Sequence, residues 1–197
     1  MLSIFLFSYK NFTLSVLLDG QVGGKMYSHS HHKMTEQGKL AHTLNGRLPG
    51  TEFYMSKDDP RIATDGLSPQ DGMYMIAPGV VKNDDGSFSK NTKVVTVESY
   101  YKEYYRMANV ETNTFSTDFL KLREMRLEYK LPGSTLKKTP FSKASIAFYA
   151  RNLFCITDYP LFDPESAALN GSSMVTGVET GSLPTARTFG LNINLSF

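Results

Sequence analysis

The last residues of the chain have the most regular pattern of apolar and polar side chains. Odd-numbered positions within 189–197 are apolar, and the positions between them hold glycine, asparagine or serine. Because successive side chains of a β-strand point to opposite faces, this period of two predicts a strand with one apolar and one polar face. Similar alternation predicts strands over 2–8, 12–18, about 120–131 and 144–153.

The connections between these expected strands differ greatly in length. The turn at 9–11 and the link at 132–143 are short, whereas 20–118 and 154–184 are long. Alternation alone also fits a soluble β-sandwich, but sandwiches place turns every 8 to 12 residues or so. Outer-membrane barrels instead alternate short periplasmic turns with long extracellular loops. The lengths therefore favour a membrane barrel, and counting strand directions from a periplasmic turn at 9–11 places Phe197 on the periplasmic side.

The long segment 20–118 is rich in Asn-Gly, Asp-Gly and Pro-Gly pairs, which mark turns. Within it, 97–107 places charged residues around clustered tyrosines and is predicted to form a short helix or a pair of turns. The pattern thus predicts five strands, this one short element and much ordered loop.

Composition and charge narrow the class of protein. The chain is 41% hydrophobic and 12% aromatic, which favours strands over helices. Its net charge of +2 comes from residues spread along the chain, so nucleic acid is not an expected partner. Cys155 is the single cysteine, which excludes an intramolecular disulfide. No apolar run reaches the roughly 18 residues of a membrane helix, but a barrel strand needs only about 10.

The N-terminal residues 1–7 are mostly apolar and could be taken for a signal peptide. They lack a basic region before the apolar run and a small-residue cleavage site after it. We interpret them as a strand.

Several segments, in order, resemble SusC/RagA-type TonB-linked outer-membrane transporters, a group of TonB-dependent receptors. The resemblance covers nearly the whole chain. It is carried by Tyr9–Phe12, Asp65–Gly66, Glu98–Tyr101, Phe119–Pro132, Arg151–Phe154, Thr157–Tyr159, Asp163–Glu165, Gly181–Arg187 and the last strand with its terminal Phe197.

The resemblance implies an all-β fold, an antiparallel membrane β-barrel of which this chain holds only the C-terminal strands, about five with long extracellular loops. Residues 1–197 would be the C-terminal part of a TonB-dependent receptor barrel, with no plug domain present. Five strands would leave two unpaired edges in lipid. We therefore expect a truncated gene product, an incomplete gene model or a piece of a longer polypeptide.

The family also implies a function. The parent would import oligosaccharides or peptides across the bacterial outer membrane, working with a SusD-like surface lipoprotein and with TonB through N-terminal parts not in this sequence. The barrel-assembly machinery would recognise Phe197, with an ordinary strand end as the alternative. No enzymatic activity, cofactor or metal is expected. Two other interpretations stay open: a soluble β-rich glycan-binding module, and a non-functional truncated remnant of the transporter.

The alternation assigns side chains to two environments. We expect outer-membrane lipid to contact Phe12, Leu14, Val16, Met125, Leu127, Tyr129, Phe189, Leu191, Ile193 and Leu195. The polar interior would be lined by Arg126, Glu128, Lys130, Tyr149, Arg151, Asn192 and Asn194.

Loop aromatics are the candidate substrate-binding residues. Aromatic rings can stack on sugars, and simple loop packing is the alternative. The candidates are Tyr100, Tyr101, Tyr104 and Tyr105.

Other motifs are weaker. The histidines at 29, 31, 32 and 42 supply imidazoles for a metal, but no carboxylate or thiol stands at a ligand spacing, so a polar loop is the preferred interpretation. Segment 83–86 fails as a calcium loop, and 20–25 departs from the phosphate loop and fits a strand end entering a loop. Cys155 has no nearby base and is expected to be a buried or loop thiol. Loop carboxylates that could hold a cation, or be solvated or capping, are Asp158, Asp163 and Glu165.

Overall fold

The computed structural model describes residues 1–68, 72–161, 163–165, 168–170 and 173–197. The chain divides into two compact units. The sheet unit comprises Met1–Met26, Phe115–Val178 and Ser182–Phe197, and the loop unit comprises Tyr27–Thr114 and Glu179–Gly181.

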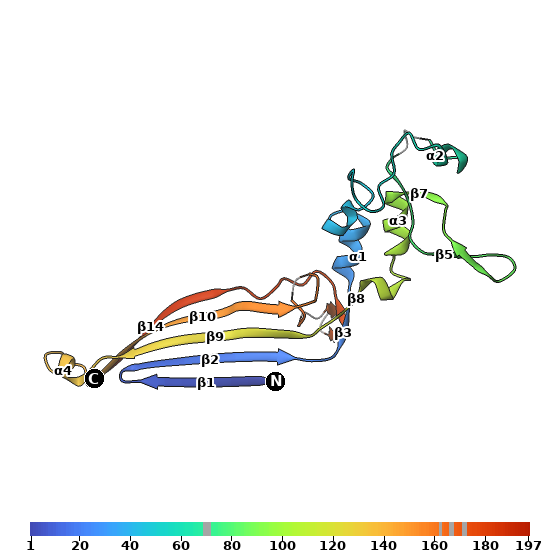
Figure 1. Cartoon of the computed structure of the whole chain (residues 1–197). Helices are drawn as coiled ribbons and strands as arrows, with labels where there is room; N and C mark the ends of the chain where they lie inside the picture. The colour runs from blue at the N-terminus through green and yellow to red at the C-terminus, as the bar shows by residue number, and fades with distance from the viewer. Residues whose placement is uncertain (69–71, 162, 166–167, 171–172) are drawn as a thin grey trace. The chain divides into compact units, whose positions relative to one another are not determined.

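The sheet unit is built on one antiparallel sheet in the order β1-β2-β9-β10-β14 (Figure 1). These strands confirm the five that the alternation predicts, although β10 continues several residues further than expected. The described residues form an open sheet and do not close a barrel. The strands are β1 (Leu2–Tyr9), β2 (Phe12–Gln21), β9 (Phe119–Lys130), β10 (Lys143–Thr157) and β14 (Thr188–Ser196).

The short connections are as tight as predicted. Tyr9 pairs with Phe12, so only Lys10 and Asn11 form the turn, and Lys10 has a positive φ of 52°. The link between β9 and β10 contains a single helical turn, α4 (Gly133–Leu136), directly after Pro132.

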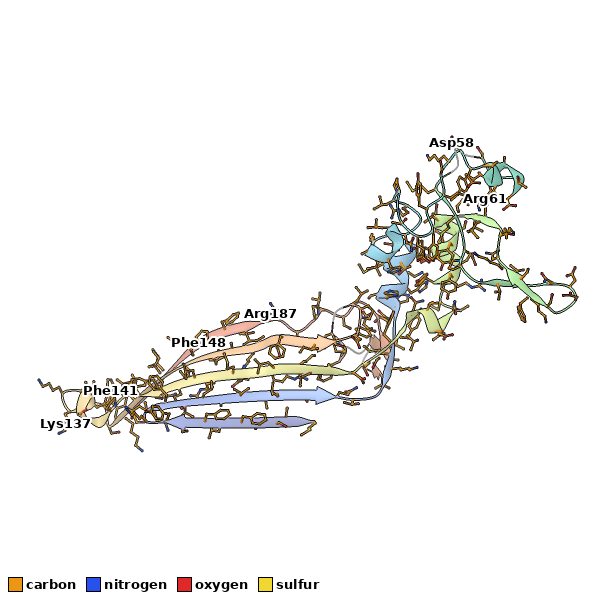
Figure 2. The ribbon with its side chains drawn as sticks, viewed as in Figure 1. Asp58, Arg61, Lys137, Phe141, Phe148 and Arg187 are labelled. Atoms are coloured by element: carbon orange, nitrogen blue, oxygen red, sulfur yellow. The ribbon has the colours of Figure 1, made fainter. Side chains whose placement is uncertain are left out.

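The strand register separates apolar from polar side chains as the sequence predicts. Leu127 of β9 lies opposite both Leu14 of β2 and Phe148 of β10. Phe148, which is labelled in Figure 2, in turn lies opposite Leu191 of β14. Leu191 and its neighbour on the same face, Ile193, are each 60% exposed. We call this side of the sheet the apolar face, and no described residues form a second layer that buries it.

The opposite side, which we call the polar face, carries charged and small side chains. Tyr149 of β10 lies opposite Arg126 and Gly190, and Arg151 lies opposite Glu124. A Cβ atom at Gly190 would lie 2.3 Å from the Tyr149 ring. A side chain at 190 would therefore require the Tyr149 ring to move.

The outer strand β1 departs from this separation. Phe5 and Phe7 pair with Val16 and Leu14 on the apolar face, so the alternate residues of β1 lie on the polar face. Those residues include Ile4 and Leu6, which are 72% and 67% exposed. The strand is predicted correctly, but it is apolar on both of its faces.

The loop unit contains more helix than the sequence indicates. Helix α3 (Val97–Tyr104) confirms the short helix expected over 97–107. Helix α1 (His29–Glu36) lies where we expected a polar loop, because its three histidines conceal any apolar period. The other elements between β2 and β9 are β3 (Lys25–Ser28), η1 (Ala41–Leu44), α2 (Pro60–Thr64), β4 (Tyr74–Ile76), β5 (Val80–Lys82), β6 (Phe88–Lys90), β7 (Val94–Thr96), η2 (Val110–Asn113) and β8 (Thr114–Ser116).

The connection between β10 and β14 also contains short strands. These are β11 (Ala168–Asn170), β12 (Ser173–Val175) and β13 (Val178–Glu179). No helix among the described residues is long and apolar enough to span a membrane.

Strand β4 organises the core of the loop unit. Its adjacent residues Tyr74 and Met75 are both fully buried, and in a strand they point to opposite sides. Tyr74 packs with Ile62 and Val94, whereas Met75 packs in a second cluster that includes Tyr101 of α3. One short strand therefore joins two small apolar clusters.

The start of α1 is fixed by a buried carboxylate. Glu179 has no exposed surface and accepts hydrogen bonds from the hydroxyls of Ser28 and Ser30, each at 2.7 Å, and from the Gly181 N–H. The Ser28 hydroxyl also accepts a bond of 3.0 Å from the His31 N–H as the N-cap of α1. Glu179 thus joins the β10–β14 connection to the first turn of this helix.

Candidate functional site

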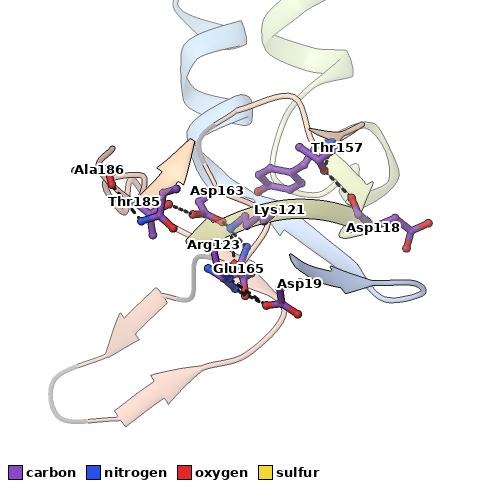
Figure 3. Close-up of polar contacts among 11 residues, drawn as sticks. Asp19, Asp118, Lys121, Arg123, Thr157, Asp163, Glu165, Thr185 and Ala186 are labelled. Atoms are coloured by element: carbon purple, nitrogen blue, oxygen red, sulfur yellow. Dashed lines mark hydrogen bonds and ion pairs between the residues drawn. The ribbon is translucent and has the colours of Figure 1, made fainter. Parts of the chain in front are cut away.

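A network of ion pairs lies on the polar face of the sheet (Figure 3). Lys121 of β9 is 3% exposed, and its ammonium contacts the carboxylates of Asp163 and Glu165. Arg123 pairs with Asp19 at 2.8 Å and also contacts Glu165. We call these five residues the ionic network; it joins two strands to the β10–β14 connection.

Further bonds fix the position of Asp163. Its carboxylate accepts hydrogen bonds of 2.8 Å from the Thr185 hydroxyl and 3.0 Å from the Glu165 N–H. Burial acts to raise the pKa of Asp163, but the hydrogen bonds from Lys121, Glu165 and Thr185 outweigh it and lower that pKa. The connection is thereby held to the sheet near both of its ends.

The expected roles of the loop carboxylates need correction. Asp163 caps the Glu165 N–H as proposed, but it is 6% exposed and ion-paired rather than solvated. Lys121 and Arg123 supply the positive charge that a bound cation would have supplied. Among the residues that the structure describes, no three His, Cys, Asp or Glu side chains are grouped to hold a metal ion.

The four candidate tyrosines fall into two pairs. Tyr101 is 5% exposed and donates to the carbonyls of His42 at 2.8 Å and Asn45 at 3.2 Å, so it supports the core. Tyr105 stacks on the His42 ring with centroids 5.3 Å apart. Tyr100 and Tyr104 stack on each other at 5.4 Å, and Tyr104 is exposed. Stacking on a sugar stays a prediction; Tyr104 is the exposed one of the four, whereas Tyr100 also packs against the cluster around Met75.

The histidines are packing residues of the loop unit and do not form the polar loop that we expected. His31 is buried, with its Nδ1 2.9 Å from the Asn113 side-chain oxygen and its ring stacked 5.1 Å from that of His42. His32 is 2% exposed, and its Nδ1 lies 3.2 Å from the Tyr27 hydroxyl. Helix α1 brings these rings inward, which the sequence did not indicate.

We expect the loop unit to lose stability as the pH falls below about 6.5. Burial lowers the pKa of His31, His32 and His42, so the folded unit takes up their protons at a lower pH than the unfolded chain, whose histidines titrate near 6.5. Their contribution is fully present above about 6.5 and is lost as the pH falls through the folded values. Melts followed by tyrosine near-UV circular dichroism at pH 7.5 and 5.5 measure the change.

The variant His31→Gln should reduce this pH dependence, and His29→Gln, on the same helix, is its matched control. A loop unit equally stable at both pH values would contradict the prediction.

The remaining motifs have structural roles. Asn83–Gly86 lies in the turn between β5 and β6, where Asp85 accepts bonds from Ser87. Strand β2 ends at Gln21, which confirms that 20–25 is a strand end entering a loop. Cys155 is exposed on β10, so the expectation of a buried or loop thiol is wrong. Phe197 is 88% exposed, with its ring 5.1 Å from that of Phe141, and its role in assembly stays a prediction.

The loop unit contains a pocket of about 570 Å³ between the end of α1 and the start of α3. Of the candidate tyrosines, only Tyr101 lines it. Sequence reasoning missed Arg47, Glu36 and Lys102 in this pocket, because they are far apart in the chain and match no motif. A smaller pocket of about 130 Å³ lies beside the ionic network and includes Cys155 in its lining.

Comparison with known proteins shows a similarity by sequence to a TonB-dependent receptor. The chain is 31% identical over 87 residues to "TonB-dependent receptor P3" of Formosa agariphila. That alignment covers 42% of this chain and 9% of the receptor. No family model matches the chain.

Solved structures show the same fold. The chain superimposes on a chain of the RagAB peptide importer in its closed-closed state with a TM-score of 0.55, at 20% identity. The open-open state gives a TM-score of 0.54 at 19% identity. Both matches cover 96% of this chain and 16% of the solved chain, so these 197 residues correspond to a small part of the proteins they resemble.

Proposed function

We propose that this chain, which is related to the TonB-dependent receptors of the SusC/RagA type, forms part of the wall of an outer-membrane β-barrel importer. The observation that carries the proposal is the two-faced sheet. Its apolar face is exposed over neighbouring strands, and its polar face carries paired charges. A transmembrane barrel has this arrangement, with lipid outside and a polar interior.

The strand lengths fit a membrane crossing. A tilted transmembrane strand needs about 9 to 11 residues. Strands β2, β9 and β14 contain 10, 12 and 9 residues. In water, the apolar face would be a large exposed hydrophobic surface, which soluble monomers rarely keep.

The open edges of the sheet require further strands. Strands β1 and β14 each pair on one side only within the described residues. In lipid each unpaired backbone group costs several kcal/mol. We infer that neighbouring strands of a longer barrel cover both edges, with the chain as its C-terminal part and the loop unit on the extracellular side.

The names of the relatives support a proposal for the substrate and the partners. The solved neighbours are described as a peptide importer, and the sequence relative as a TonB-dependent receptor. We propose import of peptides or oligosaccharides with a SusD-like lipoprotein at the extracellular mouth, driven through TonB. Recognition of Phe197 by the barrel-assembly machinery belongs to the same proposal.

A charged substitution on the apolar face tests whether the sheet is part of a barrel wall. Leu191→Arg should destabilise the membrane-inserted protein by about 2–4 kcal/mol, the cost of arginine on a lipid-facing strand near the bilayer midplane. Asn192→Arg is the matched control, since residue 192 lies on the polar face opposite Ala147. Outer-membrane fractionation and urea unfolding in lipid vesicles measure the difference.

If Leu191→Arg and Asn192→Arg destabilised the membrane-inserted protein equally, the assignment of the sheet to a barrel wall would be contradicted. So would a chain that is monomeric and soluble in water without detergent, which would favour the soluble glycan-binding module instead.

A further inference from the structure

The pocket of the loop unit has the size of a small-molecule site. Its volume of about 570 Å³ falls within the roughly 300–1,000 Å³ typical of ligand pockets. Its walls come from the last turn of α1, from Arg47 and from the first turns of α3. The contacts described above give this pocket no role.

Arg47 is the distinctive group in this lining. Its Nη1 donates to the Gly38 carbonyl at 3.1 Å, which uses one of the five N–H donors of a guanidinium. Within the described part of the chain, Arg47 forms no ion pair. Gly38 leaves room for it, since a Cβ there would lie 3.0 Å from Nη1. The guanidinium is therefore anchored on one side and keeps most of its donors for a ligand.

The carboxylates of the lining already have partners. Glu36 pairs with Lys33 at 2.8 Å, and Glu98 pairs with Lys102 at 2.5 Å. The hydrogen bond from Lys33 lowers the pKa of Glu36, so this carboxylate stays ionised. The lining itself contains two carboxylates and two cations. Because Lys33, outside the lining, pairs with Glu36, and Lys102 pairs with Glu98, Arg47 is the lining cation left without an ion pair among the described residues, which favours an anionic group.

Part of the remaining wall is apolar or aromatic, and threonines and Gln37 form much of the rest. Val97 and Tyr101 line the pocket beside Met73, and the first two belong to the cluster around Met75. A ligand that fits therefore combines one anionic group with an apolar part. Carboxylates match the planar donor pattern of arginine.

We propose that this pocket binds the carboxyl-terminal end of a short peptide, with Arg47 paired to the terminal carboxylate and the last side chain against Val97 and Tyr101. The inference rests on the proposed function in two respects: the choice of a peptide among carboxylates with an apolar part comes from the proposed import of peptides, and the loop unit must face the extracellular medium to meet such a ligand.

The protein has no tryptophan, so a tryptophan-containing probe can be followed without protein background. The probe is the dipeptide Leu-Trp, titrated with the full chain in detergent and followed by tryptophan fluorescence anisotropy. Saturable binding is expected, and the C-terminal amide of the same dipeptide should bind about tenfold more weakly or worse. The variant Arg47→Gln should cause a similar loss and should bind acid and amide alike.

The matched control is Arg106→Gln, an exposed arginine of the same unit that pairs with Glu103 and does not line the pocket. It should bind as the original protein does. Arg47→Lys should recover part of the affinity. Tyrosine near-UV circular dichroism shows whether each variant folds, and if Arg47→Gln does not, the acid and amide comparison in the original protein decides.

Three results would overturn the proposal: equal binding of acid and amide, equal losses from Arg47→Gln and Arg106→Gln, or no saturable binding by a folded chain. Galacturonate, a carboxylate without an apolar side chain, should compete about tenfold more weakly than Leu-Trp, and equal competition would overturn assignment to a peptide end. If the chain inserts into membranes but does not bind the probe, only this inference is contradicted. If the chain is soluble and binds the probe, only the proposal of a barrel wall is contradicted.

Discussion

Replacing Lys121 with methionine is expected to destabilise the sheet unit by about 3–5 kcal/mol, because it leaves the carboxylates of Asp163 and Glu165 without their shared cation. Methionine keeps most of the length of the lysine side chain, so the loss reports the charge and not a cavity. Lys121 and Asp163 are both almost fully buried, so water cannot replace the missing partner. Urea unfolding of the full chain in detergent, followed by strand circular dichroism, measures the change.

The matched control is Lys130→Met, an exposed lysine on the same strand. Exposed charges contribute little, so this variant should lie within about 0.5 kcal/mol of the original protein. If Lys121→Met and Lys130→Met unfolded at the same urea concentration, the ionic network would not be what holds the β10–β14 connection to the sheet.

Glu179→Ala is expected to destabilise the loop unit by about 2–4 kcal/mol, because each buried polar group left without a partner costs about 1–3 kcal/mol. The Ser28 and Ser30 hydroxyls lose their acceptor, and Ser28 is itself fully buried. Since Ser28 also caps α1, the first turn of this helix should fray. Thermal melts followed by tyrosine near-UV circular dichroism measure the loss.

Glu111→Ala provides the control, since Glu111 is an exposed carboxylate of the same unit. Glu179→Gln should fall between the two, because its amide oxygen still accepts from one hydroxyl, whereas the hydroxyl beside the NH₂ group must reorient to accept from it and the negative charge is lost. A melting temperature of Glu179→Ala equal to that of Glu111→Ala would show that the buried carboxylate is dispensable.

The five long strands were predictable because their signal is local. A period of two in side-chain polarity is visible in the sequence itself, as in Phe189–Phe197. It can be recognised without knowing which strand lies alongside. The ends of the strands were less predictable. Strand β10 continues to Thr157, beyond a bulge between Arg151 and Phe154 where Asn152 has a positive φ. Nothing in the alternation marks such a bulge.

The ionic network could not be predicted, because its members are far apart in the chain. Asp163 lies 42 residues from Lys121, and Asp19 lies 104 residues from Arg123. The segments 163–165 and 181–187 drew attention through the family resemblance, and Asp163 and Glu165 also as possible cation ligands. The structure gives them a physical role, since Asp163, Glu165 and Thr185 hold the connection to the polar face.

The loop unit was the hardest part to predict. Helix α1 is short, its side chains are mainly polar, and tertiary contacts such as the His31–Asn113 bond stabilise it. Of the residues around the pocket, Tyr101 attracted attention as a possible sugar platform, yet it supports the core. Arg47 carries no local signal, because its significance depends on the neighbours that the fold assembles.

The insertion of the loop unit between two paired strands has a consequence for folding. Gln21 of β2 and Phe119 of β9 are direct neighbours in the sheet, although roughly a hundred residues separate them. Bringing the ends of an unfolded segment of that length together costs entropy before any strand contact forms. A loop unit that folds first shortens this search, so pairing of β2 with β9 should proceed fastest after the insertion has condensed.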